Sequence, residues 1–182
     1  MNYLRAIGLL LAVLLMGHSA TAAWEADSSD ELQVKAALAI AEIRERLPRT
    51  EPFFEQAYGF AILPSVTRAG FGFGGAYGKG IVVEGDVAIG RTKFWQFSSG
   101  IQAGAKNYSM IVFFKDKLAL DYFKTAELQF MGQAGLAFAK VGVAGTPAFN
   151  DGVAIMTVTR IGLMGEFSAA GGKFSYKPLS ED

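Results

Sequence analysis

The chain has 182 residues, which is enough for one domain with a sizeable core. Its 17 basic residues are balanced by 17 acidic ones, so it lacks the basic excess of a typical nucleic-acid-binding protein, and we expect no nucleic acid among its partners. It contains no cysteine, which excludes disulfides, cysteine nucleophiles and lipid attachment to an N-terminal cysteine.

The N-terminus has the features of a cleavable export signal. Arg5 precedes an uncharged, leucine-rich run over residues 6–16, which falls short of the ~20 apolar residues that a membrane-spanning helix needs. Small residues at Ala20 and Ala22 predict cleavage after Ala22. We therefore expect a signal peptide over residues 1–22 and a periplasmic or secreted protein, with a retained membrane anchor as the alternative.

Removal of this signal leaves a chain with neither histidine nor cysteine, because His18 is the only histidine. Such a chain lacks the usual general base at neutral pH, the Ser-His triad and the nitrogen and sulfur ligands of zinc sites. Two acids, Glu84 and Asp86, flank Gly85 in a pattern that is typical of a hairpin turn. We expect no enzymatic activity, no catalytic residue, no cofactor and no metal site.

The first element after the signal is a predicted amphipathic helix from Ser28 to about Leu47. Ser28 and Glu31 have the spacing of an N-terminal capping box, and Pro48 ends the helix. The apolar stripe of this helix follows steps of three and four residues and consists of Leu32, Ala36, Ile40, Ile43 and Leu47. Such a stripe packs on a sheet or inserts into a membrane.

A second, short helix is predicted between Thr50, as its capping residue, and Gly59. The rest of the sequence predicts mainly short strands, interrupted by a helix over residues 116–124. The expected strands cover residues 60–63, which end at Pro64, and then 69–83, 87–89, 92–97, 100–114, 127–143, 153–159, 161–168 and 173–176. A hairpin turn is expected at Gly171-Gly172.

A glycine-rich run lies at the centre of this β-rich region. Even positions from 70 to 80 hold five glycines and Ala76, whereas odd positions hold Phe71, Phe73, Tyr77 and Lys79. A face without side chains lets another backbone approach closely. We therefore expect an α+β fold: one β-rich domain over residues 23–182, whose twisted antiparallel sheet closes to a barrel or a tight sandwich, with N-terminal helices and one short inserted helix.

The same run formally matches a dinucleotide-binding fingerprint at Gly70-x-Gly72-x-x-Gly75. That fingerprint requires a helix directly after the loop, whereas the alternation here continues as strand through Gly80. We therefore do not expect nucleotide binding.

Several stretches of the chain together resemble a known family. They are Phe53-Phe54-x-x-Ala57-Tyr58-Gly59-Phe60-Ala61, Leu63-Pro64-Ser65-Val66, the run from Gly70 to Gly80, and Gly100-x-Gln102-x-Gly104 with Tyr108-Ser109. In these stretches the sequence resembles the SYLF domain, the lipid-binding or actin-binding domain of yeast, plant and animal cortical proteins, over residues 32–174. The resemblance implies a lipid-binding module that recognises phosphoinositides with help from a basic N-terminal helix, and in some eukaryotic members binds actin.

A lipid site combines apolar surface for acyl chains with cations for head groups. The candidate cations are Lys79, Arg68, Lys35, Arg44, Arg46 and Arg49. Lys79 is the strongest of them, because it interrupts a stretch of glycines and aromatic residues. The candidate apolar lining consists of Phe71, Phe73 and Tyr77, whose alternative role is packing in the core.

The expected function is that of a non-enzymatic lipid-binding module of the cell envelope. Because the export signal predicts an envelope location, the expected ligands are anionic phospholipids or phosphoinositide-like head groups at a membrane surface. The alternative is an envelope scaffold that uses the same surface for a protein partner. The sequence assigns no oligomeric state.

Overall fold

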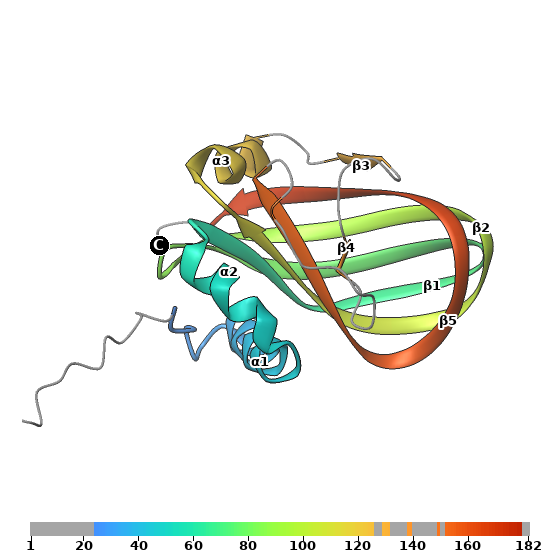
Figure 1. Cartoon of the computed structure of the whole chain (residues 1–182), viewed down its shortest axis with the longest axis horizontal. Coiled ribbons are helices and arrows are strands. Elements are labelled where there is room, and N and C mark those ends of the chain that lie inside the picture. Colours follow the sequence, from blue (N-terminus) through green and yellow to red (C-terminus); the bar gives the residue numbers. More distant parts are fainter. Residues whose placement is uncertain (1–23, 126–128, 132–137, 140–148, 150–151, 180–182) are drawn as a thin grey trace, which may run out of the picture.

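The computed structural model describes residues 24–125, 129–131, 138–139, 149 and 152–179 (Figure 1). The expected signal peptide and its cleavage site lie outside these residues. The helical elements are α1 (Glu31–Arg46), the short 3-10 turn η1 (Pro48–Thr50), α2 (Glu51–Gln56) and α3 (Lys117–Thr125). The strands are β1 (Gly59–Glu84), β2 (Val87–Phe114), β3 (Gln129–Met131), β4 (Phe138–Ala139) and β5 (Val153–Pro178).

The strands form one mostly antiparallel sheet in the order β1-β2-β5-β3, and β4 adds to β5 in the parallel direction. β1 pairs with β2, and β2 with β5, along nearly their whole lengths. The expected α+β class, the N-terminal helices, the inserted helix and the turn at Gly85 are confirmed. The φ of Gly85 is +57°, as the first central residue of a primed two-residue hairpin turn requires.

The prediction of many short strands is wrong, because three long strands replace them. Pro64 lies inside β1, where the register shifts between Leu63 and Val66, so the residue without an N–H group sits at an irregularity of an edge strand. The Gly171-Gly172 pair lies inside β5, opposite Phe97 and Gln96, and forms no turn. Glycine and proline therefore mark irregular or close-packed positions here rather than strand ends.

The helix caps also differ from the prediction. Asp30, not Ser28, caps α1: its Oδ1 accepts hydrogen bonds from the backbone N–H groups of Leu32 at 2.9 Å and Gln33 at 3.4 Å. Thr50 caps nothing with its side chain, since its hydroxyl donates to the carbonyl of Leu47 at 2.8 Å.

The three long strands bend in their middle, so that the sheet folds over on itself (Figure 1). As a result, the two halves of β1 meet at a seam of three glycines, Gly59, Gly78 and Gly80, which we call the glycine seam. A Cβ atom added to Gly80 would lie 2.3 Å from the carbonyl oxygen of Ile62, and one added to Gly59 would lie 2.6 Å from that of Val83. The expected close backbone approach on the bare face is thus confirmed at Gly78 and Gly80.

The expected closure to a barrel is nevertheless wrong. Within the described residues β1 pairs with β2 alone, so the sheet keeps an open edge. At the seam, the two halves of β1 approach each other through glycine backbone. At the end of the seam, the Gly85 N–H donates to the Tyr58 carbonyl at 3.2 Å.

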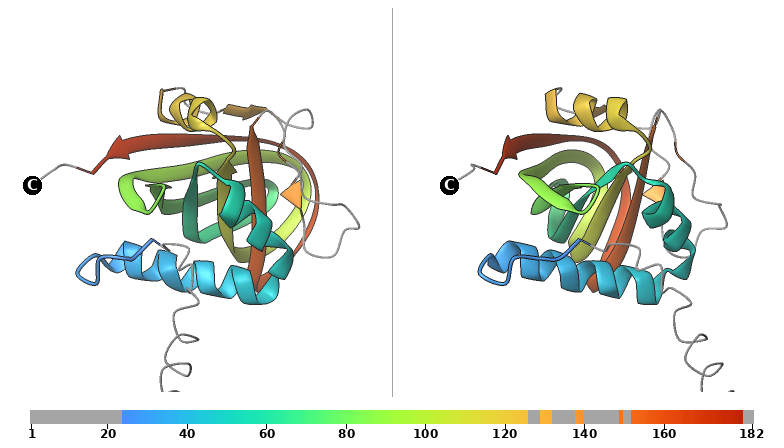
Figure 2. Two further views of the ribbon diagram at one scale, coloured as in Figure 1. Left: turned by 60° about the vertical axis from the view of Figure 1, so that its left-hand side comes forward. Right: turned by 90° about the vertical axis from the view of Figure 1, so that its left-hand side faces the viewer.

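Two apolar clusters fill the folded sheet. The inner cluster lies between the two halves, and its members include Leu63, Phe94, Met110, Phe114, Leu120, Phe123 and Phe174. The outer cluster packs Ala36, Ala39 and Ile43 of α1 against the sheet residues Ile62, Ile81, Val83, Ile111, Phe113 and Met156. Figure 2 shows α1 and α3 on opposite sides of the folded sheet. The apolar stripe of α1 therefore packs on the sheet.

The glycine seam predicts that Gly80→Ala strongly destabilises the domain. The added methyl group would meet the Ile62 carbonyl, which cannot move without disturbing its strand, so we expect a loss of about 3 kcal/mol in the free energy of unfolding. Gly75→Ala is the matched control, because its nearest contact is the Gln96 carbonyl at 3.3 Å. Urea unfolding followed by circular dichroism measures both. Equal losses of unfolding free energy in the two variants would refute the close backbone approach at the glycine seam.

Candidate functional site

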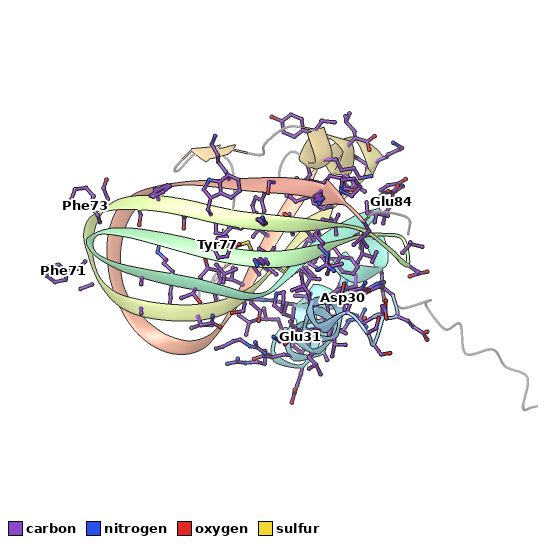
Figure 3. All side chains as sticks on the ribbon, turned by 180° about the vertical axis from the view of Figure 1, so that it is seen from behind. Asp30, Glu31, Phe71, Phe73, Tyr77 and Glu84 are labelled. Atoms are coloured by element: carbon purple, nitrogen blue, oxygen red, sulfur yellow. The ribbon has the colours of Figure 1, made fainter. Side chains whose placement is uncertain are left out.

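The aromatic residues of the glycine-rich run are on the surface. Phe71 is 87% exposed, Phe73 is 81% exposed and Tyr77 is 49% exposed. Figure 3 shows Phe71 and Phe73 at the bend of the sheet, at the end away from the helices, with Tyr77 between the bend and Glu84. Packing of these rings in the core is therefore wrong, whereas their expected role as an apolar surface for lipid stays a prediction. The inner face of this segment turns toward the other half of the sheet, so the odd positions point outward.

Strand alternation places Lys79 on the same outer face, two residues beyond Tyr77. The pairing register puts Lys93 directly opposite Lys79, Trp95 opposite Tyr77, and Phe97 opposite Gly75. Directly paired residues of an antiparallel ladder share a face and lie about 5 Å apart at their Cβ atoms. The outer strip of the sheet thus consists of Phe73, Tyr77, Lys79, Lys93, Trp95 and Phe97.

The outer strip brings two like charges together without neutralising them. Lys79 and Lys93 are both exposed, and neither has an ion-pair partner among the residues that the structure describes. Like charges directly opposite each other in a sheet are destabilising by a few tenths of a kcal/mol or more. A cationic pair with this intrinsic cost is suited to an anionic ligand, which would relieve the repulsion.

The basic residues of the N-terminal helices do not join this strip. Lys35 pairs with Glu31 at 2.6 Å, and Arg46 pairs with Glu42 at 3.0 Å. Arg44 lies 3.4 Å from Glu51 and stacks over the Phe54 ring, with 4.3 Å between its guanidinium carbon and the ring centroid. Arg49 is exposed in η1, at the helical end.

The sixth candidate, Arg68, points into the fold. It is 6% exposed, and its guanidinium donates to the side-chain oxygen of Gln96 in the other half of the sheet. Of the six candidate cations, the structure therefore leaves Lys79 alone beside the exposed aromatic residues. The other five lie elsewhere on the molecule or inside it.

Charge is divided between the two ends of the molecule. The helical end, residues 24–58, contains eight acidic residues and four basic ones. β1 and β2 contain a single acidic residue, Glu84, and five basic ones, which are Arg68, Lys79, Arg91, Lys93 and Lys106. Arg91 pairs with Asp30, the cap of α1, at 2.6 Å. The sheet is therefore the cationic part, although the whole chain is neutral.

The sequence reasoning missed Lys93, Trp95 and Phe97. Their alternation with Phe94 and Gln96 is visible in the sequence, and the turn at Gly85 fixes the start of the hairpin. Pairing counted from that turn would place Thr92 opposite Lys79. A register shift between Val82 and Val83 moves the partner by one residue, to Lys93.

Other features of the molecule are weaker candidates for a functional site. A cavity of about 130 Å³ lies between the helical end and the hairpin turn, lined by residues that include Trp24, Arg44, Phe54 and Asp86. In the described part of the chain, no cluster of His, Cys, Asp and Glu is arranged to hold a metal ion. None of the described helices combines the length and apolar character needed to cross a bilayer.

The chain matches no protein-family model, and a search among curated proteins finds no significant match. The resemblance to SYLF domains therefore stays a prediction from the sequence.

Glu84 is held in a polar network rather than in a pair of catalytic acids. Its carboxylate accepts a hydrogen bond from the Lys124 ammonium at 2.9 Å and another from the Tyr58 hydroxyl at 2.8 Å. These two bonds, the one from Lys124 above all, hold the pKa of Glu84 below its ordinary value of 4.5. The network fastens the hairpin turn to α3 and to the start of β1.

The lowered pKa of Glu84 predicts a pH-dependent contribution to stability. A lowered carboxyl pKa stabilises the fold at pH values above 4.5, and this contribution is lost as the pH falls through the folded-state value. We expect Glu84→Gln to cost about 1 kcal/mol at pH 7 and clearly less at pH 3. Urea unfolding at both pH values measures this, with Glu45→Gln on the exposed face of α1 as the control. A pH-independent cost would contradict the proposed network.

Proposed function

We propose that the protein binds the surface of anionic phospholipid membranes without enzymatic activity, and that Lys79 and Lys93 hold the lipid phosphates. The single observation that supports this most is the pair itself: two exposed lysines lie opposite each other on neighbouring strands, beside exposed aromatic rings. A lysine near an anionic membrane surface contributes about 1 kcal/mol to binding. The two lysines together therefore give the protein a measurable affinity for anionic membranes, which weakens as salt is added.

Two further features agree with this function. β1 and β2 contain more basic than acidic residues, and this excess would favour the approach of the sheet to an anionic surface. The resemblance to SYLF domains implies a lipid-binding module, and the expected export signal would direct it to the cell envelope. In contrast to the basic helix that the resemblance implies, the proposed contact is made by strands, because the helical end has an acidic excess.

A scaffold that binds a protein partner is the second candidate. The observation that favours it is the group of exposed aromatic side chains, since exposed apolar patches are typical of protein interfaces as well as of membrane contacts. A protein partner of this kind would be indifferent to lipid charge. Binding to vesicles of defined composition therefore separates the two functions.

The proposed function predicts charge-selective binding of the purified protein to vesicles. We expect co-sedimentation with vesicles that contain phosphatidylglycerol, little with pure phosphatidylcholine, and weakening as salt is added. The Lys79→Ala/Lys93→Ala double variant should bind roughly 30-fold more weakly, which corresponds to about 2 kcal/mol for two lysines.

The matched control is Lys35→Ala/Arg49→Ala, which removes the same charge from the helical end and should leave binding nearly unchanged. Equal weakening by both double variants would show that net charge, not the outer strip, determines binding. Absence of binding to any vesicle would refute the proposed function and favour the scaffold.

A further inference from the structure

Polarity is graded along the outer strip, from the bend toward the hairpin turn. The bend presents Phe71, Phe73 and Phe97, which are 87%, 81% and 77% exposed. Next come the amphipathic rings of Tyr77 and Trp95, and then the two lysines. The order is apolar, then aromatic with a polar group, then cationic.

This order matches the layers of a membrane interface. Trp and Tyr side chains concentrate at the level of the lipid head groups, apolar rings favour the region below, and lysines extend toward the phosphates. A strand rises about 3.3 Å per residue, so Phe73 lies about 13 Å along β1 from Tyr77, and Lys79 lies about 7 Å further. The head-group region on one side of a bilayer is only about 5–8 Å thick, so the strands must lie obliquely to the membrane for the rings and the lysines to contact it together.

The two strands that carry these rings bring no acidic residue to the bend, whereas the register places Glu166 of β5 opposite Gln102 of β2 there. β1 has no acidic residue before Glu84 at its far end, and β2 has none at all. Gly72, at the tip, has a φ of +70°, and a Cβ atom there would meet no atom of the described residues within 4 Å. The acidic end of the molecule, with Asp30 and Glu31, is on the opposite side (Figure 3).

We propose that the protein docks bend-first: Phe71, Phe73 and Phe97 enter the apolar boundary of the bilayer, Tyr77 and Trp95 lie among the head groups, and the helical end faces away from the membrane. The lysines that follow the aromatic residues require a negatively charged partner, so the partner is an anionic lipid surface. This inference rests on the proposed function and adds to it a definite orientation and an apolar anchor. It makes the strands, rather than α1, the membrane-binding element.

Fluorescence quenching by lipids brominated in their acyl chains tests the orientation. Trp24→Phe/Trp95→Phe provides a background without tryptophan, into which Phe73→Trp places a reporter at the bend and Leu38→Trp places one on the exposed face of α1. On anionic vesicles we expect a blue shift and quenching for the Phe73→Trp reporter and neither for the Leu38→Trp reporter. Quenching of the α1 reporter, or of neither while the protein sediments with the vesicles, would overturn bend-first docking.

The apolar anchor is tested separately by Phe71→Ser/Phe73→Ser, with Leu38→Ser as the control. Both rings are almost fully exposed, so the fold should be unaffected, and circular dichroism checks this. We expect at least tenfold weaker vesicle binding that keeps its salt dependence, and no change for Leu38→Ser. Unchanged binding, or a change in oligomeric state instead of in vesicle binding, would overturn the anchor.

The two proposals fail in different ways. Binding that depends on Lys79 and Lys93 but leaves the Phe73→Trp reporter unquenched would refute insertion and leave surface binding in place. No binding of the unaltered protein to any vesicle would refute both.

Discussion

The architecture depends on one close contact, between the backbone at Gly80 and the carbonyl of Ile62 at the other end of the same strand. Only glycine permits this approach, and the approach folds the long three-stranded sheet over on itself. The fold-over encloses the inner apolar cluster and turns the odd positions of the glycine-rich run outward. A glycine-rich run costs chain entropy when it forms a strand. In this strand, one end of the run forms the glycine seam, and the other end carries the exposed aromatic residues.

The fold-over also separates the charges of a neutral chain. α1 packs on the outer face beside the seam. Acidic residues of α1 pair with basic residues of the same helix, and Asp30, which caps α1, pairs with Arg91. The bend lies at the other end, with aromatic rings on its outer face. Lys79 and Lys93 follow these rings, and neither has an ion-pair partner in the described part of the chain. Membrane binding by such a molecule would be directional, because the acidic end is repelled by the surface that attracts the sheet.

Secondary-structure class was largely predictable from the sequence, whereas strand length and the direction of side chains were not. The periodicity of α1 and the turn at Gly85 are local signals and were recovered. The predicted strand end at Pro64 and the predicted turn at Gly171-Gly172 are wrong, because a bulge in a strand and a turn have the same local composition.

The candidate site was predicted only in part for a similar reason. Lys79 was found because it interrupts an uncharged run. Core packing of Phe71 and Phe73, one of their two predicted roles, is wrong because the sequence does not show which face of a bent strand is covered. Lys93 was missed because a register shift in the hairpin decides its partner, and such a shift is a property of the folded sheet.

Hydrogen exchange of the unaltered protein, with and without phosphatidylglycerol vesicles, tests the central claim most directly. The account predicts that vesicles slow exchange in peptides covering residues 69–79 and 92–98, and leave peptides of α1 unchanged. Slower exchange in α1, with no change at the bend, would contradict it.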